Sequence, residues 1–286
     1  MLYLKNFNFP NLSDEEDFRF NLHRTCYNSM YPFGILSKNK IENLEFKQIT
    51  IFYGGNGSGK STAINVISEK LGLDRDSSFN KTNFFNSYLK LCSYVGKIPI
   101  NSSVITSDDV FDFMINLRNI NEDLDKQRKS LISEYESLKK DNFKMKSLSD
   151  YDKLKKSSMA KKLTQSEFVR RNIQENVVGQ SNGESAFMYF TNKINSNALY
   201  LLDEPENSLS PEKQLELLKY LQDSVRFYDC QFIIATHSPF FLALRDALIY
   251  DFDENPVKIK NWTSLKNVQI LYEFFKAHQN EFSEQV

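Results

Sequence analysis

Residues 54–62 read Gly-Gly-Asn-Gly-Ser-Gly-Lys-Ser-Thr and follow the apolar stretch Lys47-Gln48-Ile49-Thr50-Ile51-Phe52-Tyr53. They match the pattern G-x-x-x-x-G-K-[ST], in which a glycine-rich loop joins a strand to a helix. Such a loop wraps a triphosphate with consecutive backbone N–H groups. Glycine suits it because the backbone comes close and some residues take a positive φ. The expected helix points the positive end of its dipole at the same anion. The stretch therefore predicts a nucleoside triphosphate site.

Individual residues of this loop are predicted to contact phosphate and metal. Lys60 can reach the β- and γ-phosphates, and the Ser61 hydroxyl can bind Mg²⁺. The alternative is a flexible glycine loop, which the apolar strand before it disfavours. A nucleoside triphosphate with Mg²⁺ is therefore the expected ligand of the loop. The other residues expected to surround the nucleotide are Gly54, Gly55, Asn56, Gly57, Ser58, Gly59 and Thr62.

Composition narrows the class of protein. The 286 residues suffice for one or two domains, and 36 Lys and Arg nearly balance 37 Asp and Glu, so no global field favours nucleic acid or an anionic membrane. Cys26, Cys92 and Cys230 show no paired spacing and are interpreted as reduced thiols. No apolar run approaches the ~18–20 residues of a membrane helix, and the first residues lack a signal-peptide core. We therefore expect a soluble, cytoplasmic protein without direct membrane contact.

The pattern of apolar residues predicts an α/β fold. Continuous apolar runs at 198–202 and 231–235 are typical of parallel strands covered on both faces. Between them, Ser210 is a candidate N-cap and Pro211 the first residue of a helix that runs to about residue 227. Residues 73–97 give no firm prediction. Further strands are expected at 1–9, 45–53 and 103–107, and a further helix at 62–71, before Gly72.

Between about residues 108 and 180 the amino-acid composition of the chain changes. Glycine and proline disappear up to Gly179, and apolar residues recur at a nearly heptad spacing from Met114 to Leu138. This predicts a helical insert, either a hairpin or a small bundle. Residues 138–162 contain nine lysines. They are interpreted as a solvated helical face, with a patch for nucleic acid or an acidic partner as the alternative.

The run at 198–202 leads into Asp203-Glu204-Pro205-Glu206. Carboxylates at the carboxyl end of a parallel strand point into the crevice where such sheets bind ligands. Asp203 is predicted to support Mg²⁺, and Glu204 to accept a proton from an attacking water. The alternative is an acidic strand end that faces solvent.

The run at 231–235 leads into Thr236-His237-Ser238-Pro239. A neutral imidazole here can hydrogen-bond the γ-phosphate or the attacking water, and a satisfied core histidine is the alternative. Residues 181–185, Ser-Asn-Gly-Glu-Ser, precede an expected helix and can bind an anion at its N-terminus. Taken alone, that last stretch is equally consistent with a plain N-cap.

In this order, the stretches 54–62, 181–185, 198–206 and 236–239 resemble the ABC-type ATPases, in their SMC/Rad50/RecF-like and OLD-like branch. In that branch the signature reads S-x-G-E, and the acidic strand continues as D/E-E-P-E…L…P, which Leu209 and Pro211 fit. The chain most resembles the small stand-alone bacterial ATPases, predicted AAA/ABC proteins that share Ile105-Thr106-Ser107-Asp108-Asp109-Val110-Phe111.

The resemblance implies an α/β P-loop NTPase, an ABC ATPase head with a helical insert subdomain. The implied divisions are an N-terminal lobe (1–107), the insert (108–180), a C-terminal lobe (181–254) and a helical tail (255–286). It also implies a homodimer on ATP binding, with each ATP between the loop of one copy and Ser181, Gly183 and Glu184 of the other. In this reading Lys60, Glu204 and His237 are catalytic, and Ser61 and Asp203 hold the metal.

The chain departs from the family pattern at two places. Ser107, Asp108 and Asp109 stand where the Q-loop glutamine is expected, and Ser210 replaces the D-loop aspartate. For the adenine-stacking aromatic, Tyr31 and Phe33 are candidates, with core aromatics as the alternative. The Asp251-Phe252-Asp253 stretch is interpreted as a strand end and not as a nuclease pair. The tail, with Trp262, Leu271, Phe274 and Phe275, is interpreted as an amphipathic helix packed on the head, with a docking face as the alternative.

The predicted function is that of an ATPase switch that acts on a partner effector, such as a nuclease in a defence or repair system. One alternative is a DNA-processing ATPase that uses the insert's lysines. The other is the cassette of a transporter, against which the signature at 181–185 and the missing glutamine count.

Overall fold

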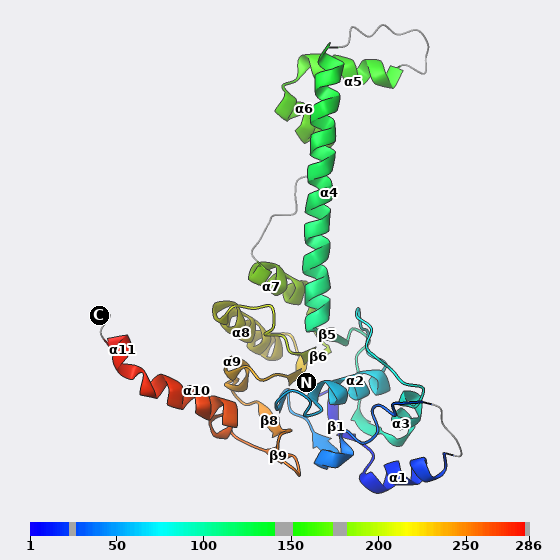
Figure 1. Cartoon of the computed structure of the whole chain (residues 1–286), viewed down its shortest axis with the longest axis vertical. Helices are drawn as coiled ribbons and strands as arrows, with labels where there is room; N and C mark the ends of the chain where they lie inside the picture. The colour runs from blue at the N-terminus through cyan, green and yellow to red at the C-terminus, as the bar shows by residue number, and fades with distance from the viewer. Residues whose placement is uncertain (23–26, 141–150, 174–181, 284–286) are drawn as a thin grey trace. The chain divides into compact units, whose positions relative to one another are not determined.

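The computed structural model describes residues 1–22, 27–140, 151–173 and 182–283. The chain forms two compact units (Figure 1). The first, here called the head, comprises Met1–Phe111 and Asn182–Val286, and the second, here called the insert, comprises Asp112–Ser181. Within the described residues, no helix combines the length and hydropathy that a membrane span requires.

A six-stranded sheet forms the centre of the head, in the order β5-β6-β7-β3-β8-β9. All neighbouring strands are parallel except the pair β8 and β9, which is antiparallel. The sheet confirms the predicted α/β fold class. Its strands are β3 (Ile49–Tyr53), β5 (Ser103–Thr106), β6 (Leu199–Asp203), β7 (Gln231–Ala235), β8 (Leu248–Asp251) and β9 (Lys258–Ile259).

Helices on this sheet follow the local signals of the sequence. α2 (Lys60–Leu71) ends where Gly72 takes the left-handed conformation at φ 66° and its N–H bonds the last turn. α8 (Pro211–Phe227) begins as predicted, since the Ser210 side chain accepts a hydrogen bond from the N–H of Lys213. The other helices of this region are α7 (Asn182–Lys193) and α9 (Pro239–Leu242).

A second, three-stranded antiparallel sheet has the order β2-β1-β4. The prediction of one strand over 45–53 is wrong, because the chain changes sheets within it. The N–H of Phe46 donates to the carbonyl of Lys5 (2.8 Å), whereas Ile49 pairs with Phe232 in the parallel sheet. The unassigned stretch 73–97 contributes one helix and the edge strand. The elements are β1 (Leu4–Asn8), α1 (Leu12–Phe20), the 3-10 helix η1 (Ser37–Asn39), β2 (Asn43–Glu45), α3 (Phe85–Leu91) and β4 (Ser93–Gly96).

The helical insert is confirmed. Its helices are α4 (Ser107–Lys140), which begins in the head, α5 (Tyr151–Lys162) and α6 (Gln165–Asn172). They share a small core of Tyr135, Leu138, Ala160 and Phe168. The apolar spacing predicts more burial along α4 than the structure has, since Ile120 is 47% exposed.

The tail forms the 3-10 helix η3 (Trp262–Ser264), α10 (Lys266–Ala277) and α11 (Gln279–Ser283). The expected packing of this helix on the head is wrong. All residues of α10 are described, and Val268 is the one that is buried. Phe274 and Phe275 are 56% and 53% exposed.

One polar side chain joins the two sheets. Gln231 is fully buried at the start of β7, and its Oε1 accepts the N–H groups of Tyr3 (2.8 Å) and Leu4 (2.9 Å). Its Nε2 donates to the carbonyls of Leu4 (2.8 Å) and Lys47 (3.1 Å). The amide thus satisfies four backbone groups at the point where the chain crosses between sheets.

We expect Gln231→Leu to lower the free energy of unfolding by about 3–6 kcal/mol, because several buried backbone groups lose their partner at ~1–3 kcal/mol each. Urea denaturation measures the change. Gln48→Leu, at an exposed glutamine one strand away, is the control and should stay within about 0.5 kcal/mol of the parent. Equal effects of the two variants would contradict this role of Gln231.

Candidate active site

The loop at 54–59 joins β3 to α2 and needs glycine for geometric reasons. Gly57 and Gly59 take φ values of 82° and 101°, in the left-handed region. A Cβ on Gly54 would lie 2.6 Å from Ser58 Oγ. Gly59 is the N-cap of α2 and has no side chain to cap the helix, so the N–H groups of the first turn remain available to an anion.

Lys60 folds back over this loop. Its Nζ donates hydrogen bonds to the carbonyls of Gly54 (2.6 Å) and Gly55 (3.0 Å), and the residue is 4% exposed. The ammonium group therefore already lies at the mouth of the loop, where a phosphate could replace the carbonyls as its partner.

Asp203, at the end of β6, reaches the first turn of α2. The Ser61 hydroxyl donates to Asp203 Oδ1 at 3.0 Å. Burial raises the pKa of Asp203 to about 6, the hydrogen bond from Ser61 lowers it, and the nearby Glu204 carboxylate raises it further. A buried carboxylate with a raised pKa at a strand end is typical of a functional site.

Glu204 is held in an uncommon backbone conformation directly after Asp203. Its φ is 50°, a region that non-glycine residues rarely adopt and that often marks functional sites. Its N–H donates to the carbonyl of Ala235 (2.9 Å), and Asn207 Nδ2 donates to its Oε2 (2.8 Å). Glu204 is therefore held both at its backbone and at its carboxylate.

His237 lies beside these carboxylates. Its Nδ1 is 3.9 Å from Glu204 Oε1 and 3.6 Å from Glu206 Oε1, and 44% of its side chain is exposed. Glu206 itself is buried and accepts hydrogen bonds from the Thr236 hydroxyl (2.6 Å) and the His237 N–H (3.1 Å). The sequence motif included Glu206 but assigned it no role. In the structure it fastens the end of β7 and thereby positions His237.

His237 lines a separate hollow together with Glu206. The loop and Glu204 border a hollow of about 390 Å³. It is lined by the loop residues Asn56, Gly57 and Gly59, by Lys60, Ser61 and Thr62, and by Ile35 and Glu204. The structure therefore brings the loop and the acidic strand end together. Ile35 had no signal in the sequence, because it lies in an irregular segment far from the motif.

Two signature residues, Gly183 and Glu184, lie in the first turn of α7 on the head. Ser181 falls outside the described residues. Gly183 packs beside the start of α8, where an added Cβ would lie 3.4 Å from Lys213 Cγ and 4.0 Å from the Ser210 nitrogen. Neither Gly183 nor Glu184 is among the described residues that line the hollow.

Two polar side chains that the sequence analysis did not single out for this role fasten the loop. Asp253, in the turn after β8, accepts the N–H of Gly55 with both carboxylate oxygens (2.8 and 3.0 Å). Asn39 Nδ2 donates to the carbonyl of Ser58 (3.2 Å). The strand-end interpretation of Asp251–Asp253 is confirmed. Because β8 is parallel to β3, the end of β8 lies beside the loop, which is the signal that could have identified Asp253.

The candidates for adenine stacking are core aromatics. Phe33 is 5% exposed and stacks on Phe18 with ring centroids 4.7 Å apart. The ring of Tyr31 lies 5.8 Å from that of Phe85. Neither is among the described residues that line the hollow.

The replaced Q-loop position is partly explained by Asp109. Its Oδ2 accepts the N–H (2.7 Å) and the hydroxyl (2.8 Å) of Thr106, and its Oδ1 accepts the N–H of Ser77 (2.7 Å). Asp109 thus caps the start of α4. A role of Ser107 or Asp108 near the nucleotide stays a prediction.

The lysines of the insert make some local contacts. Lys156 Nζ pairs with Glu134 (2.8 Å), and Lys139 Nζ donates to the Tyr135 hydroxyl (3.0 Å). The nucleic-acid hypothesis stays a prediction.

The donor set at Ser61 and Asp203 fits Mg²⁺. Among the residues that the structure describes, no three His, Cys, Asp or Glu side chains form a cage for a metal. Mg²⁺ is usually bound by one or two protein oxygens together with substrate phosphates and water. The hydroxyl and carboxylate, 3.0 Å apart beside the loop, provide this arrangement.

Comparisons with known proteins agree with this geometry. The family model described as "ABC transporter" matches residues 40–207, more than half of the chain, and the model described as "AAA ATPase domain" matches residues 181–242. No protein among the curated ones matches.

Several solved structures are similar in fold at low identity. The SMC head domain from Thermotoga maritima is 15% identical over 91% of this chain and 98% of that chain, with a TM-score of 0.41. The Smc head domain from Pyrococcus furiosus, bound to the C-terminal domain of ScpA, is 14% identical over 81% and 94%, with a TM-score of 0.39. A dimeric ATP-binding cassette bound to ADP and phosphate is 15% identical over 78% and 90%, with a TM-score of 0.37.

We expect Asp253→Ala to loosen the loop. Hydrogen bonds to a charged group contribute about 1.5–3 kcal/mol, so amide hydrogen exchange at Gly55 should be at least about tenfold faster. Nuclear magnetic resonance or mass spectrometry of a peptide that spans the loop measures the rate. Asp253→Asn keeps an acceptor oxygen and is the matched control, with a smaller increase. An unchanged rate in Asp253→Ala would contradict the clamp.

The pKa of Asp203 predicts a pH-dependent stability. Between about pH 4 and 6 the folded protein holds a proton that the unfolded chain has lost, so stability falls as pH rises through this range. Asp203→Asn removes the charge and keeps an acceptor for Ser61. We therefore expect it to raise the free energy of unfolding at pH 7.5 by about 1–3 kcal/mol, from ~1.4 kcal/mol per pKa unit.

Urea denaturation without nucleotide or metal measures this difference. It should shrink towards zero as the pH is lowered to about 4. A gain of equal size at both pH values would show that the substitution acts through packing and not through the charge.

Proposed function

The chain belongs to the ABC transporter family, whose domains are P-loop ATPases, and on this premise we propose that it binds and hydrolyses ATP with Mg²⁺. One observation carries the proposal. The Ser61 hydroxyl, on the helix after the loop, and the Asp203 carboxylate, at the end of a different strand, are 3.0 Å apart. Two stretches separated by 142 positions thus meet beside an uncapped helix start.

The loop and Lys60 would bind the phosphates. The N–H groups of the loop and of the first turn of α2 would bind the triphosphate, and Lys60 would exchange its carbonyl partners for phosphate oxygens. Ser61 and Asp203 hold the metal. When bound, Mg²⁺ neutralises charge on the phosphates. Asp253 and Asn39 keep the loop in place from the turn after β8 and from η1.

The groups at the ends of β6 and β7 would carry out hydrolysis. The Glu204 carboxylate accepts a proton from the attacking water, which its oriented side chain can aim. His237 hydrogen-bonds the γ-phosphate or that water, and Glu206 holds the backbone of His237. The close approach of Glu204 and His237, 3.9 Å, supports a shared target between them.

The ATPase works as a head-to-tail dimer in this proposal. Gly183 and Glu184 lie in the first turn of α7, and neither is among the described residues that line the hollow of their own chain. A second copy that brings Ser181, Gly183 and Glu184 to the exposed γ-phosphate completes the site. ATP then binds the closed dimer more tightly than the open one, which makes the pair a conformational switch.

We infer that this switch acts on a protein effector. The head carries the ATPase residues, and the described residues of the insert form a separate helical unit through which closure can be transmitted. A nuclease of a defence or repair system is the class of effector proposed, and the cytoplasm, where ATP is supplied, is the proposed location. Both rest on analogy with other ABC-type ATPases.

Glu204→Gln should bind ATP but hydrolyse it about 10²–10⁴-fold more slowly, because the base is lost while the shape is kept. The variant should therefore accumulate as an ATP-bound dimer. Light scattering with and without ATP measures the mass, and phosphate release measures the rate.

Lys60→Ala is the control for this experiment. This variant should not form the ATP-dependent dimer, because it lacks the lysine that contacts the phosphates. A Glu204→Gln protein that neither gains mass nor becomes more compact in small-angle X-ray scattering at saturating ATP would contradict the sandwich mechanism.

A further inference from the structure

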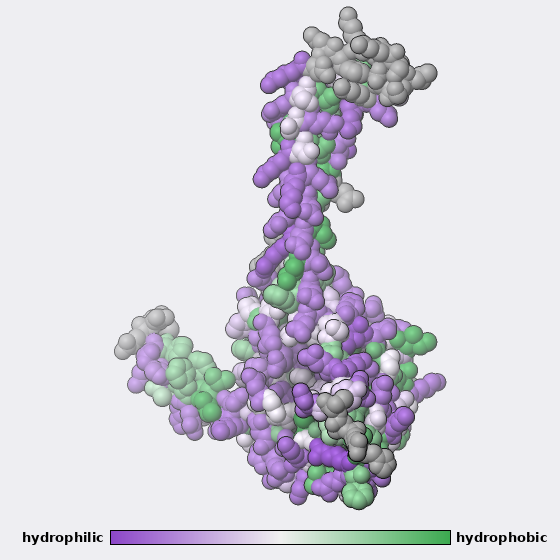
Figure 2. Space-filling view, turned by 45° about the vertical axis from the view of Figure 1, so that its right-hand side comes forward, coloured by the Kyte–Doolittle hydropathy of each residue, from purple (hydrophilic) through white to green (hydrophobic). Residues whose placement is uncertain are grey.

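Apolar side chains cover much of the circumference of α10. At 100° per residue they span about 200°, which is wider than one buried stripe. One face carries Val268, Leu271, Tyr272 and Phe275, and a second carries Ile270 and Phe274. Figure 2 shows hydrophobic side chains gathered on this C-terminal segment. Except for Val268, all of these side chains are exposed. The described part of the chain covers Val268 and leaves the other side chains of both faces exposed.

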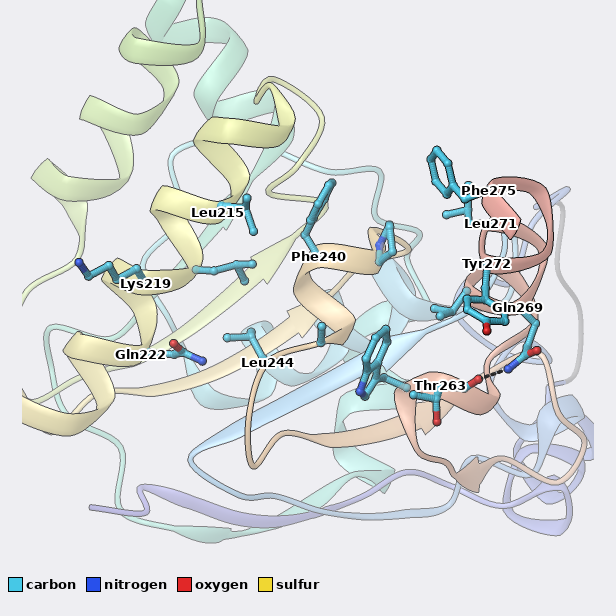
Figure 3. Close-up of a pocket in the computed structure, with 15 residues that line it drawn as sticks. Leu215, Lys219, Gln222, Phe240, Leu244, Thr263, Gln269, Leu271, Tyr272 and Phe275 are labelled. Carbon is cyan, nitrogen blue, oxygen red and sulfur yellow. Dashed lines mark hydrogen bonds between the residues drawn. The ribbon is translucent and has the colours of Figure 1, made fainter. Parts of the chain in front are cut away.

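The first of these faces borders an open groove. The groove has a volume of about 820 Å³ and lies between α8 and α9 on one side and η3 and α10 on the other. In Figure 3, Leu215 and Phe240 line one wall, and Leu271 and Phe275 the other. Lys219 is the one charged side chain among the described lining residues. About 820 Å³ corresponds to roughly two turns of a helix about 10 Å in diameter.

The same segment therefore provides a groove and an apolar helix of a size to fill it. In an isologous dimer, both copies contribute the same surface. If one residue contacts a second residue across the two-fold axis, the reciprocal contact also forms. If α10 of a second copy lay in this groove, the first apolar face of each α10 would be covered by the other α10. This arrangement would also place the second face against α8 and α9 of the neighbouring copy.

The buried area would suffice for a stable contact. A fully covered aromatic side chain buries on the order of 150–250 Å². With about half its surface exposed, each large side chain on α10 would contribute roughly 100 Å². Together with the walls of two grooves, two copies reach roughly the 1,200–2,000 Å² of a standard interface.

We propose that α10 of one copy lies antiparallel to α10 of a second copy, each in the groove between α8, α9 and α10 of the other. The contact is a dimer interface that requires no nucleotide. It goes beyond the ATP-dependent contact, since among the described residues none of α10 lines the hollow beside the phosphate loop.

Analytical ultracentrifugation of the full chain without nucleotide tests this contact. We expect a dimer, and at least a tenfold weaker dimer constant for Phe274→Ser and for Phe275→Ser. Both side chains are exposed, so neither change should unfold the head. Phe227→Ser is the matched control, at a phenylalanine that is 65% exposed at the end of α8 and outside the groove. Its dimer constant should match that of the parent.

Three results would overturn the proposal. The first is a parent chain that stays monomeric at about 100 µM without nucleotide. The second is a dimer that neither α10 substitution weakens. The third is a monomer that binds phosphatidylcholine vesicles through Phe274 and Phe275, which would make a lipid surface the occupant. Lys60→Ala, which should lose ATP-induced closure, should leave this dimer intact, so the two contacts can be tested separately.

Discussion

The parallel pairing of β3, β7 and β6 is the constraint on which the site depends. Ala235 pairs with Phe52 on one side and with Asp203 on the other, so the three strands end at one level. The backbone continues this alignment, since the N–H of Glu204 donates to Ala235 and that of Thr236 to Phe52. The loop, the acidic pair and the histidine meet because their strands end together.

Polar side chains then hold this edge in shape through backbone groups. Glu206 fastens the end of β7, Asp253 and Asn39 hold two sides of the phosphate loop, and Gln231 joins the sheets at the opposite end of β7. All four act where regular strand pairing stops and backbone groups need other partners. The structure thus prepares the loop before a ligand arrives, which reduces the ordering cost of binding.

The isolated chain leaves two surfaces that call for a second copy. The signature residues Gly183 and Glu184 lie in the first turn of α7 and do not line the hollow that they are proposed to complete. The tail exposes an apolar helix beside an apolar groove. Both surfaces belong to the head, so closure on ATP and a contact that persists without ATP could act on the same pair of chains. A switch of this kind needs one contact that changes and one that keeps the partners together.

By itself, the sequence determined the phosphate loop, the strand runs at 198–202 and 231–235, and the helix from Pro211. Each of these depends on short-range chemistry, such as glycine conformations, N-caps and continuous apolar runs. Tertiary structure alone decided the break at Phe46, the role of Asp253, the Ile35 wall of the hollow and the exposure of α10. These depend on which strand lies beside which, and on whether a facing surface exists to cover an apolar side chain. No local pattern encodes either, because the partners are separated by up to about two hundred residues along the chain.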